Sequence, residues 1–350
     1  MLTLISFASV LIVLIVVHEL GHFITAKAFG IKVLEFGLGY PPRVLSITRG
    51  ETIYSINLLP LGGFVRLLGE EDPTQPDSLA SKGVGTRFIV RSAGAFMNAL
   101  LAIIIFSALF MIPQQTVVGD IVVREVTADS PAERAGVTPG DTILKIDGHT
   151  IDNSGDVGFY VRLRLGAEST WLMQRGATQE SVSLVPRLKP PEGEGAAGIR
   201  VETVDPHMES RSLPFWRAIP KGVWRMGEVL VLAKNEITQW IVGATSPGVA
   251  GPIGIAQMSG EVARAGILPL LEFAALLSIN LAILNILPIP ALDGGRLMFV
   301  ALEWVRKGKR IPPSKEGLVH LVGFVILISM IIMISFYDVQ RIFNGESLLR

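Results

Sequence analysis

Four apolar stretches constrain this chain more than any other feature of its sequence. Each is poor in charged residues and about as long as the roughly 20 apolar residues that cross a bilayer. Hydrophobic residues make up 49% of the 350, while 31 basic and 31 acidic residues give no net charge. We therefore expect an integral membrane protein with about four spans and no nucleic-acid partner. The stretches are Leu2 to Phe29, Ala93 to Ile112, Leu268 to Leu287 and Gly317 to Phe336.

Basic residues gather in two segments beside these stretches, and cytoplasmic loops of membrane proteins carry an excess of Lys and Arg. We therefore expect both segments to be cytoplasmic, with the two termini and the long middle segment outside. The first stretch has no basic residue before it and no small-residue cleavage pattern, so we expect it to be retained. The basic residues are Lys27, Lys32, Arg43, Arg49, Arg66, Lys82, Arg87 and Arg91, then Arg296, Arg306, Lys307, Lys309, Arg310 and Lys315.

The segment from Val33 to Val65 is rich in Val, Ile, Phe, Tyr and Leu and is broken by GYPPR and RGE. This composition predicts two or more short hairpin strands beside the first span. Its end, INLLPLGGFVRLL, is apolar and is expected to reach the membrane edge. Strands are tolerated there only if protein or a cavity satisfies their backbone groups.

The middle of the chain, Val117 to about Leu188, has the composition of a small soluble domain. SPAERAGV predicts a helix that begins after Ser130, has Pro131 at its first position and ends at Gly136. Strands are expected on both sides of the IDG turn that follows. By composition, KPPEGEGAAG, residues 189–198, is a flexible linker.

An amphipathic segment follows the linker and carries Trp216, Trp224 and Trp240 with basic residues between them. It is expected to form a helix at the membrane interface. A helix packed on the preceding domain is the alternative, because aromatic residues at helical spacing also belong to protein cores.

The sequence HELGH lies inside the first apolar stretch. On a helix, His18 and His22 lie one turn apart on the same face, and Glu19 lies about 100° to one side. Two imidazoles so spaced can share a zinc ion and leave the carboxylate near a bound water. The chain has no cysteine, so any metal is held by His, Asp or Glu. Polar residues in a membrane helix usually serve a function, although a hydrogen-bonded polar cluster is the alternative.

A catalytic zinc usually has three protein ligands, and the best third candidate is Asp293 in LNILPIPALDGGR. Asp293 is expected at the cytoplasmic end of the third span, at the depth of the two histidines. Asp338 and Glu272 are poorer candidates, because both are expected on the outer side.

HELGH, LPLGGFV, SPAERAGVTPGDTILKIDGHTI and NILPIPALDGG follow one another along the chain. The third motif resembles a PDZ domain, which binds peptides by strand addition. Together the four resemble the site-2 proteases, in particular the RseP-like branch of bacterial intramembrane zinc metalloproteases. The resemblance implies a polytopic α-helical membrane protein with about four transmembrane helices, a membrane-associated β-hairpin region and an inserted α+β PDZ domain.

Residue roles follow from the same resemblance. It implies His18, His22 and Asp293 as ligands of one Zn²⁺, Glu19 as the general base, and Asn285 as a group that positions substrate or stabilises the oxyanion. In the second span the family reads GPxxN, whereas this chain reads GAFMN with Ala95 in place of proline. Asn98 remains and is expected to contact substrate.

A peptide bond inside a helix is shielded by its own hydrogen bonds, so a helical substrate must unwind before cleavage. We expect the unwound segment to pair as a strand with the GGFV hairpin. Gly62 and Gly63 would permit a close approach of the two backbones.

The expected organisation has eight parts in chain order. These are the first span with HExxH (1–30), the hairpin region (31–92), the second span (93–113), the PDZ domain (114–190), the linker with the interfacial helix (191–267), the third span with the LDG motif (268–295), a cytoplasmic loop (296–316), and the fourth span with a tail (317–350).

The expected function is cleavage of the transmembrane segments of single-span membrane proteins, in regulated intramembrane proteolysis. Resemblance implies anti-sigma-factor-type proteins or remnant signal peptides as substrates. It also implies peptide C-termini or extended segments as ligands of the PDZ domain. The alternative is that the PDZ domain binds no peptide and only gates the access of substrates. The expected location is the bacterial inner (cytoplasmic) membrane, with the PDZ domain outside the cytoplasm. One alternative is a non-catalytic, membrane-anchored PDZ adaptor with a structural metal site. Another is a transporter, although no inverted repeat relates the two halves.

Overall fold

The computed structural model describes residues 1–70, 72, 74–245, 248 and 250–344. The chain forms two compact units, each considered by itself below. The first, Met1–Leu109 with Val249–Arg350, is called the helical unit, and the second, Phe110–Gly248, is called the sheet unit.

The four predicted spans are confirmed as helices that are long and apolar enough to cross a membrane. They are α1 (Leu2–Ala28), α2 (Val84–Met111), α7 (Ile267–Ile286) and α9 (Pro313–Phe343). The second and fourth begin before the predicted stretches, because α2 and α9 include the polar turns that precede each apolar run. Helix formation depends on backbone hydrogen bonds and continues past the end of the apolar pattern.

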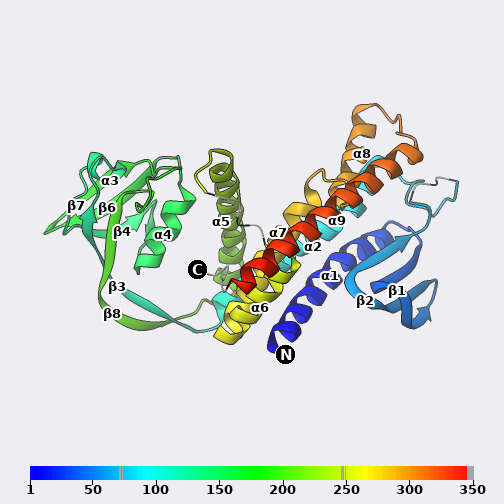
Figure 1. Ribbon diagram of the computed structural model, residues 1–350, viewed down its shortest axis with the longest axis horizontal. Coiled ribbons are helices and arrows are strands. Elements are labelled where there is room, and N and C mark those ends of the chain that lie inside the picture. Colours follow the sequence, from blue (N-terminus) through cyan, green and yellow to red (C-terminus); the bar gives the residue numbers. More distant parts are fainter. Residues whose placement is uncertain (71, 73, 246–247, 249, 345–350) are drawn as a thin grey trace. The chain divides into compact units, whose positions relative to one another are not determined.

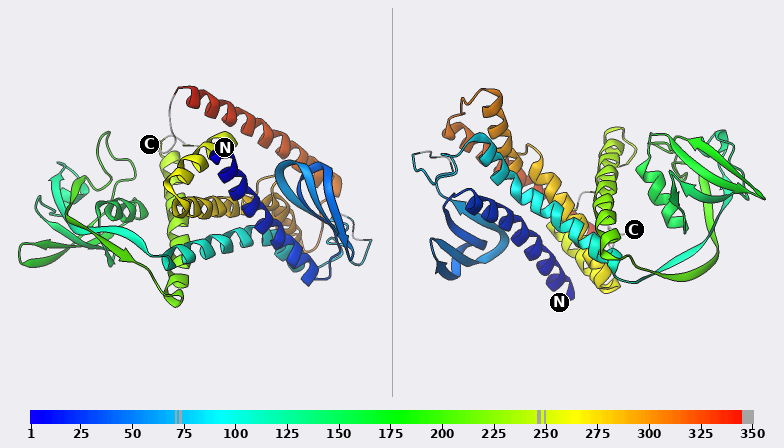
Figure 2. Two further views of the ribbon diagram at one scale, coloured as in Figure 1. Left: turned by 90° about the horizontal axis from the view of Figure 1, so that it is seen from below. Right: turned by 180° about the vertical axis from the view of Figure 1, so that it is seen from behind.

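Two shorter helices, α6 (Pro252–Ala265) and α8 (Asp293–Val305), were not predicted. Helix α6 packs against α1, α7 and α9 (Figure 2). A side chain at Gly260 would lie only 2.3 Å from Thr3 Oγ1, so the small residue permits the close approach of α6 to α1. Segments of 13 and 14 residues that mix glycine with polar residues carry no transmembrane pattern and are easily taken for loops.

The predicted hairpin is confirmed, as one long pair of strands rather than several short ones. Strands β1 (Val33–Arg49) and β2 (Thr52–Leu67) pair antiparallel around the turn at Gly50. The register shifts repeatedly between Val33 and Leu45, and such shifts bend a strand. The hairpin base packs on α1 and α2 through a buried cluster, so its position beside the first span is fixed by the core. The cluster is Ala26, Ile31, Val33, Leu67, Leu79 and Val90.

The sheet unit contains one antiparallel sheet in the order β7-β6-β4-β3-β8, with β5 paired to β4. Its core surrounds Trp171, which is fully buried. Ser130 Oγ accepts a hydrogen bond from the Glu133 backbone N–H at 3.1 Å, which confirms the predicted helix start. The elements are β3 (Gln114–Val126), α3 (Pro131–Arg134), β4 (Thr142–Ile146), β5 (His149–Thr150), α4 (Ser154–Leu163), β6 (Ser169–Arg175), β7 (Thr178–Leu184) and β8 (Ile199–Arg211).

Two predictions about this region are wrong. The domain does not end at residue 190, because β8 pairs with β3 over the whole length of both strands. Residues 189–198 are not a linker between domains but a loop within the sheet unit. The Ala132 N–H donates to the Ala197 carbonyl at 3.1 Å, and the Arg187 N–H donates to the Ala196 carbonyl at 2.9 Å. A loop and a linker share a composition, and only the pairing of the next strand distinguishes them.

The predicted amphipathic helix is α5 (Phe215–Ile241). Asn235 Nδ2 donates to the Arg162 and Leu163 carbonyls at 2.7 and 3.2 Å, which belong to the last turn of α4 and lack helical partners. One face of α5 is therefore packed on the preceding domain, which was the alternative to a helix at the membrane interface. Phe215 and Trp216 remain 59% and 63% exposed, so the interfacial location of the other face stays a prediction.

Candidate metal centre

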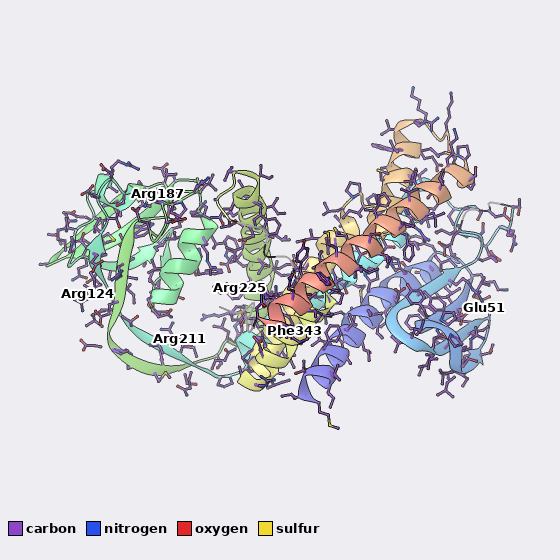
Figure 3. The ribbon with its side chains drawn as sticks, in the orientation of Figure 1. Glu51, Arg124, Arg187, Arg211, Arg225 and Phe343 are labelled. Carbon is purple, nitrogen blue, oxygen red and sulfur yellow. The ribbon has the colours of Figure 1, made fainter. Side chains whose placement is uncertain are left out.

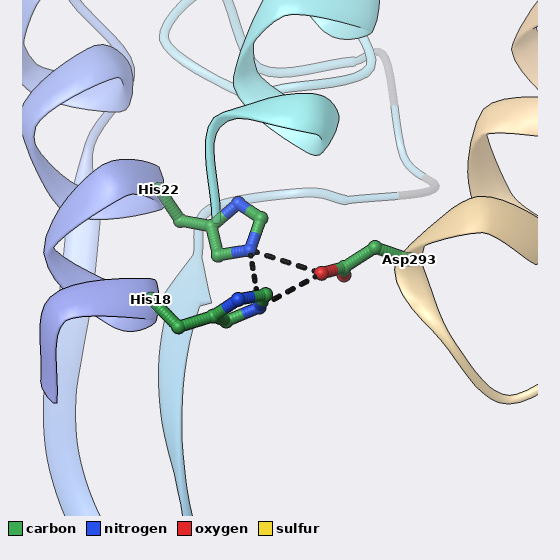
Figure 4. Close-up of side chains that lie close together, drawn as sticks. All are labelled: His18, His22 and Asp293. Carbon is green, nitrogen blue, oxygen red and sulfur yellow. Dashed lines mark hydrogen bonds and ion pairs between the residues drawn. The ribbon is translucent and has the colours of Figure 1, made fainter. Parts of the chain in front are cut away.

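The three expected ligands come together from two elements far apart in the sequence. His18 and His22 lie one turn apart on α1, and Asp293 is the first residue of α8 (Figure 4). Asp293 Oδ2 lies 3.0 Å from His18 Nε2 and 3.2 Å from His22 Nε2, and the two Nε2 atoms are 3.2 Å apart. These atoms face a common point.

Each histidine ring is held through its other nitrogen. His22 Nδ1 lies 2.7 Å from the Val90 carbonyl, which only accepts, so Nδ1 carries the hydrogen and Nε2 is free for a metal. His18 Nδ1 lies 3.3 Å from Asn98 Nδ2, and Asn98 Oδ1 is buried and has no hydrogen-bond partner among the described residues. Turning the amide by 180° lets Oδ1 accept from His18 Nδ1–H. Asn98 would then fix the orientation of the ring of this candidate ligand.

Helix α2 comes close to both rings at Gly94. A Cβ atom there would lie 2.4 Å from His22 Nε2 and 2.5 Å from His18 Nε2. Any side chain at this position would fill the point that the three ligand atoms face. Glycine is therefore required by the site, although the sequence offered only the GAFMN motif as a sign of it.

Asp293 is presented by a break between two helices, which follows the third predicted span and was not itself predicted. Helix α7 ends at Ile286, and α8 begins at Asp293. Pro288 and Pro290 lack the N–H that would continue α7. The Asp293 carboxylate lies in the first turn of α8, where the helix dipole favours a negative charge.

The fourth span supports this break. The Ala291 backbone N–H donates to His320 Nδ1 at 3.0 Å, and Ala291 has a φ of 76°. A Cβ at Gly323 would lie 2.2 Å from Pro290 Cβ, so α9 is in close contact with the loop. His320 and Gly323 therefore help to fix the segment that ends in Asp293.

The donor set fits zinc. Ligand atoms about 2.0–2.1 Å from a tetrahedral zinc are separated by roughly 3.4 Å, and catalytic sites use three protein ligands of the His and carboxylate type. The observed separations of 3.0–3.2 Å approach this spacing. In the described part of the chain, this is the one group of three such residues whose ligand atoms all lie within 4.8 Å of one another.

Glu19 lines the same cavity, of about 220 Å³, together with Tyr40 and Gly63. A Cβ at Gly63 would lie 2.9 Å from Glu19 Cγ and 2.7 Å from Ile15 Cγ2, so β2 crosses α1 at the level of Glu19. Gly62 has a φ of 144°, and its Cβ position lies 3.0 Å from the Tyr40 ring. The two glycines predicted to contact substrate thus lie where the backbone of β2 passes close to Glu19.

Two expected substrate contacts are placed differently. Asn98 is fully buried and faces His18, so it positions a ligand. Asn285, half-buried near the end of α7, does not line the cavity. Sequence reasoning missed Tyr40, Arg91 and Arg296, which do line it. Their signals were weak, since single polar residues beside apolar runs are common.

The two alternative carboxylates do not join the site. Asp338 is buried at 1% exposure, and its carboxylate accepts from the Gly254 N–H at 2.8 Å and from Arg341 at 3.0 Å. It satisfies the first turn of α6. Glu272 lies near the start of α7.

A zinc-type ligand set with an adjacent glutamate, built on helices long and apolar enough to span a membrane, defines the class of membrane metallopeptidases. Comparison with known proteins gives the family. The model of peptidase family M50 matches residues 6–330. The chain belongs to this family and is a zinc metalloprotease.

Relatives match over almost their whole length. A Clostridium perfringens protein, proposed by its name to be a zinc metalloprotease, is 36% identical over 93% of this chain and 95% of its own. A similarly named Clostridium acetobutylicum protein is 33% identical over 93% of this chain and 94% of its own. The zinc metalloprotease RasP of Geobacillus kaustophilus is 29% identical over 97% and 98%.

Solved structures also match part of the chain, and one of them is a PDZ domain. The PDZ domain of the SdrC-like protein from Listeria monocytogenes covers 23% of this chain and 85% of its own, at 23% identity and a TM-score of 0.21. That score is too low to define a fold, so the PDZ interpretation of the sheet unit rests on its sequence motif.

Proposed function

We propose that this protein is an intramembrane endopeptidase that cleaves the transmembrane segments of single-span membrane proteins, with one zinc ion held by His18, His22 and Asp293. The observation that carries the proposal is the convergence of three ligand atoms between α1 and α8, beside Glu19. Helix α1 is long and apolar enough to cross a bilayer. A peptide bond cleaved there belongs to a segment that has entered the membrane.

The chemistry follows from the residues around the ligands. A bound zinc supplies a Lewis acid and lowers the pKa of a water toward about 7. Glu19 takes the proton of the attacking water and delivers it to the leaving amine. Asn285 lies outside the cavity that Glu19 lines, so its proposed hydrogen bond to the developing oxyanion requires substrate binding to bring the two groups together. Loss of such a donor typically costs about 10²–10³ in turnover.

Strand β2 offers a place for the unwound substrate. In the described residues β2 pairs with β1 alone, and it crosses α1 beside Glu19. A substrate strand added to this hairpin would bring its backbone to the reactive carboxylate. Gly62 and Gly63 leave the space for that approach.

Replacement of both glycines by valine tests this part of the proposal. We expect cleavage of a helical substrate to fall while zinc content is unchanged. Unchanged cleavage would exclude the hairpin as the substrate's strand partner. Gly85→Val is the control, because the Cβ position of Gly85 has no neighbour within 4 Å and its φ is not positive.

The location and partners follow from the motifs and the bacterial relatives. We infer a multi-pass protein of the bacterial inner membrane with the sheet unit outside the cytoplasm, as the basic residues favour. The SPAERAGV motif supports a PDZ domain that captures peptide C-termini or extended segments. Anti-sigma-factor-type proteins and remnant signal peptides are the proposed substrates.

The test of the proposed function is cleavage of a tagged single-span substrate by the purified full chain in detergent. Wild type is compared with Glu19→Gln and with wild type plus a zinc chelator, and zinc is measured on each sample. We expect Glu19→Gln to lose about 10²–10⁴ in rate while it retains about one zinc per chain. Glu51→Gln, on the exposed hairpin turn (Figure 3), is the matched control and should cut normally.

Other results would change the conclusion. Equal cutting by all samples would assign the activity to a contaminant or to another mechanism. Zinc binding without cutting of any single-span substrate would separate the metal site from the proposed substrate class.

A further inference from the structure

A groove of about 700 Å³ in the sheet unit is lined by residues of α4 and α5. Figure 1 labels both helices. The α5 wall of the groove is apolar, with Ile219, Val223 and Trp224 respectively 50%, 46% and 60% exposed. Leu163 continues the apolar surface on α4. A concave apolar surface with a few polar groups is the usual form of a ligand site.

One carboxylate in this groove has unused hydrogen-bonding capacity. Glu228 is 7% exposed, and its Oε2 lies 3.3 Å from Arg225 Nη1. Its Oε1 is buried and has no hydrogen-bond partner in the described part of the chain. An unsatisfied buried acceptor costs about 1–3 kcal/mol, and more when charged. Such a group in a groove indicates that a ligand supplies the missing donor.

The other acid in the groove is fully engaged. Asp147 accepts from Arg164 Nε at 2.9 Å, from Ser169 Oγ at 3.1 Å and from the Thr170 N–H at 2.9 Å. Arg225, labelled in Figure 3, stacks on the Phe159 ring at 4.3 Å. Glu228 Oε2 is in an ion pair with Arg225, so the acceptor available to a ligand is Glu228 Oε1.

Two aromatic rings complete the wall beside Glu228. His149 stacks on Tyr160 with ring centroids 4.7 Å apart, and both line the groove. Burial, and then the Glu228 carboxylate, raise the pKa of Tyr160 to about 12, so its hydroxyl stays protonated. Aromatic faces next to a carboxylate suit a cationic head group on an alkyl stem.

We propose that the groove between α4 and α5 binds an extended peptide segment, with its apolar side chains against α5 and a lysine or arginine head group on Glu228. Charge complementarity argues for this occupant, because a cation restores the partner that Glu228 Oε1 lacks. The groove lies on the flank of α4 that carries Tyr160 and Leu163. Gly158 lies on the opposite flank by helical spacing. The site is independent of the metal centre and of the proposed proteolysis.

The test measures peptide binding to the full chain in detergent by fluorescence anisotropy, with Glu19→Gln in the background so that no probe is consumed. The two probes are labelled ten-residue peptides of alternating Leu and Ser with one central residue, lysine in one and norleucine in the other. We expect the lysine peptide to bind about tenfold more tightly. Glu228→Gln, which keeps the shape of the side chain, should abolish that difference.

Matched variants separate this groove from other sites. Glu236→Gln, on the same helix but outside the groove, should leave the difference unchanged. Gly227→Phe should weaken both peptides at least about tenfold, since its Cβ position has no neighbour within 4 Å and the ring would fill the groove. Gly158→Phe, equally free of neighbours, should have no effect. Circular dichroism and zinc content establish that each variant is folded.

Three results would overturn the proposal. Equal affinity of the two peptides for wild type would mean that Glu228 takes no cation. Loss of binding in Gly158→Phe but not in Gly227→Phe would place the peptide on the other flank of α4. Anisotropy changes that no variant alters would identify partition into the detergent, with lipid or detergent as the occupant of the groove.

Discussion

The two units use buried polar groups in opposite ways. In the sheet unit, buried Asp141 and Ser169 are engaged in holding strands and turns together. Asp141 accepts from Arg175 Nε and Nη2 at 2.8 and 2.7 Å and from the Thr138 N–H at 2.8 Å. In the helical unit, the ligand atoms of His18, His22 and Asp293 are turned toward one another and toward a shared point.

The difference teaches how to read a buried polar residue. Where every acceptor has a protein donor, the residue stabilises the fold. Where a glycine such as Gly63 or Gly94 lets another backbone approach and leaves space beside a buried polar residue, that polar residue is positioned for a ligand or a reaction. Glu228 departs from this pattern, because its buried Oε1 has no hydrogen-bond partner among the described residues, and for that reason it carries a proposed site.

The largest expected effect is that of Gly94→Val. Its side chain would occupy the point between the ligand atoms of His18 and His22, so we expect zinc affinity to fall by more than about 100-fold. Titration of zinc into the purified chain with a competing chelator measures this. Gly85→Val, on the same helix with no neighbour near its Cβ position, should bind zinc normally. Normal zinc binding by Gly94→Val would mean that the buried polar groups of the helical unit are not arranged around a metal.

His320→Leu should have a smaller effect on the same quantity. It removes the acceptor for the Ala291 N–H, and we expect zinc affinity to fall about tenfold, as for outer-sphere partners of ligands. His320→Asn keeps an acceptor near the position of Nδ1 and should recover most of the affinity. Equal loss in both variants would mean that His320 acts only by its bulk.

In the sheet unit, Asp141→Asn should lower the free energy of unfolding by about 1–2 kcal/mol without changing zinc affinity. The Arg175 guanidinium holds the pKa of Asp141 below its usual value. The stabilisation is therefore complete above the unfolded-state pKa of about 3.9 and is lost as the pH falls through the lower folded-state pKa. Hydrogen exchange of β4 amides against pH measures it, and wild type should lose protection on acidification more than Asp141→Asn does.

Glu202→Gln should have the smallest effect. The Arg124–Glu202 pair, at 2.6 Å, joins side chains that are 50% and 60% exposed, and exposed pairs contribute about 0–1 kcal/mol. Hydrogen exchange of β3 and β8 should be almost unchanged. A loss as large as that of Asp141→Asn would show that burial does not separate the two kinds of ion pair.

Local sequence patterns predicted much of the architecture. The four apolar runs gave the spans, because length and hydropathy alone decide whether a helix fits a bilayer. Ser130 and Pro131 gave a helix start, because an N-cap acts within one turn. HELGH predicted two candidate ligands and a candidate base, because helical spacing puts these residues side by side.

Features that depend on distant partners were not predicted. The pairing of β8 with β3 corrected the domain boundary. Whether β8 pairs depends on β3, which is distant in the sequence, and the composition of residues 189–198 does not predict this pairing. The break after Ile286 and the role of His320 depend on contacts between α9 and the loop before Asp293. Asn98 faces His18 because α2 approaches α1 at Gly94, and no local pattern records that approach.

The sequence by itself therefore determined which residue types are available for chemistry: two histidines and a glutamate on one helix, a carboxylate in the LDG motif and no thiol. Only the tertiary structure decided that Asp293 reaches both histidines, that Asn98 serves His18, and that Glu228 is left with an unpartnered oxygen. The physical reason is range. Helical periodicity, capping and apolar length act over a few residues, whereas ligand convergence and hydrogen-bond satisfaction depend on the packing of elements far apart in the chain.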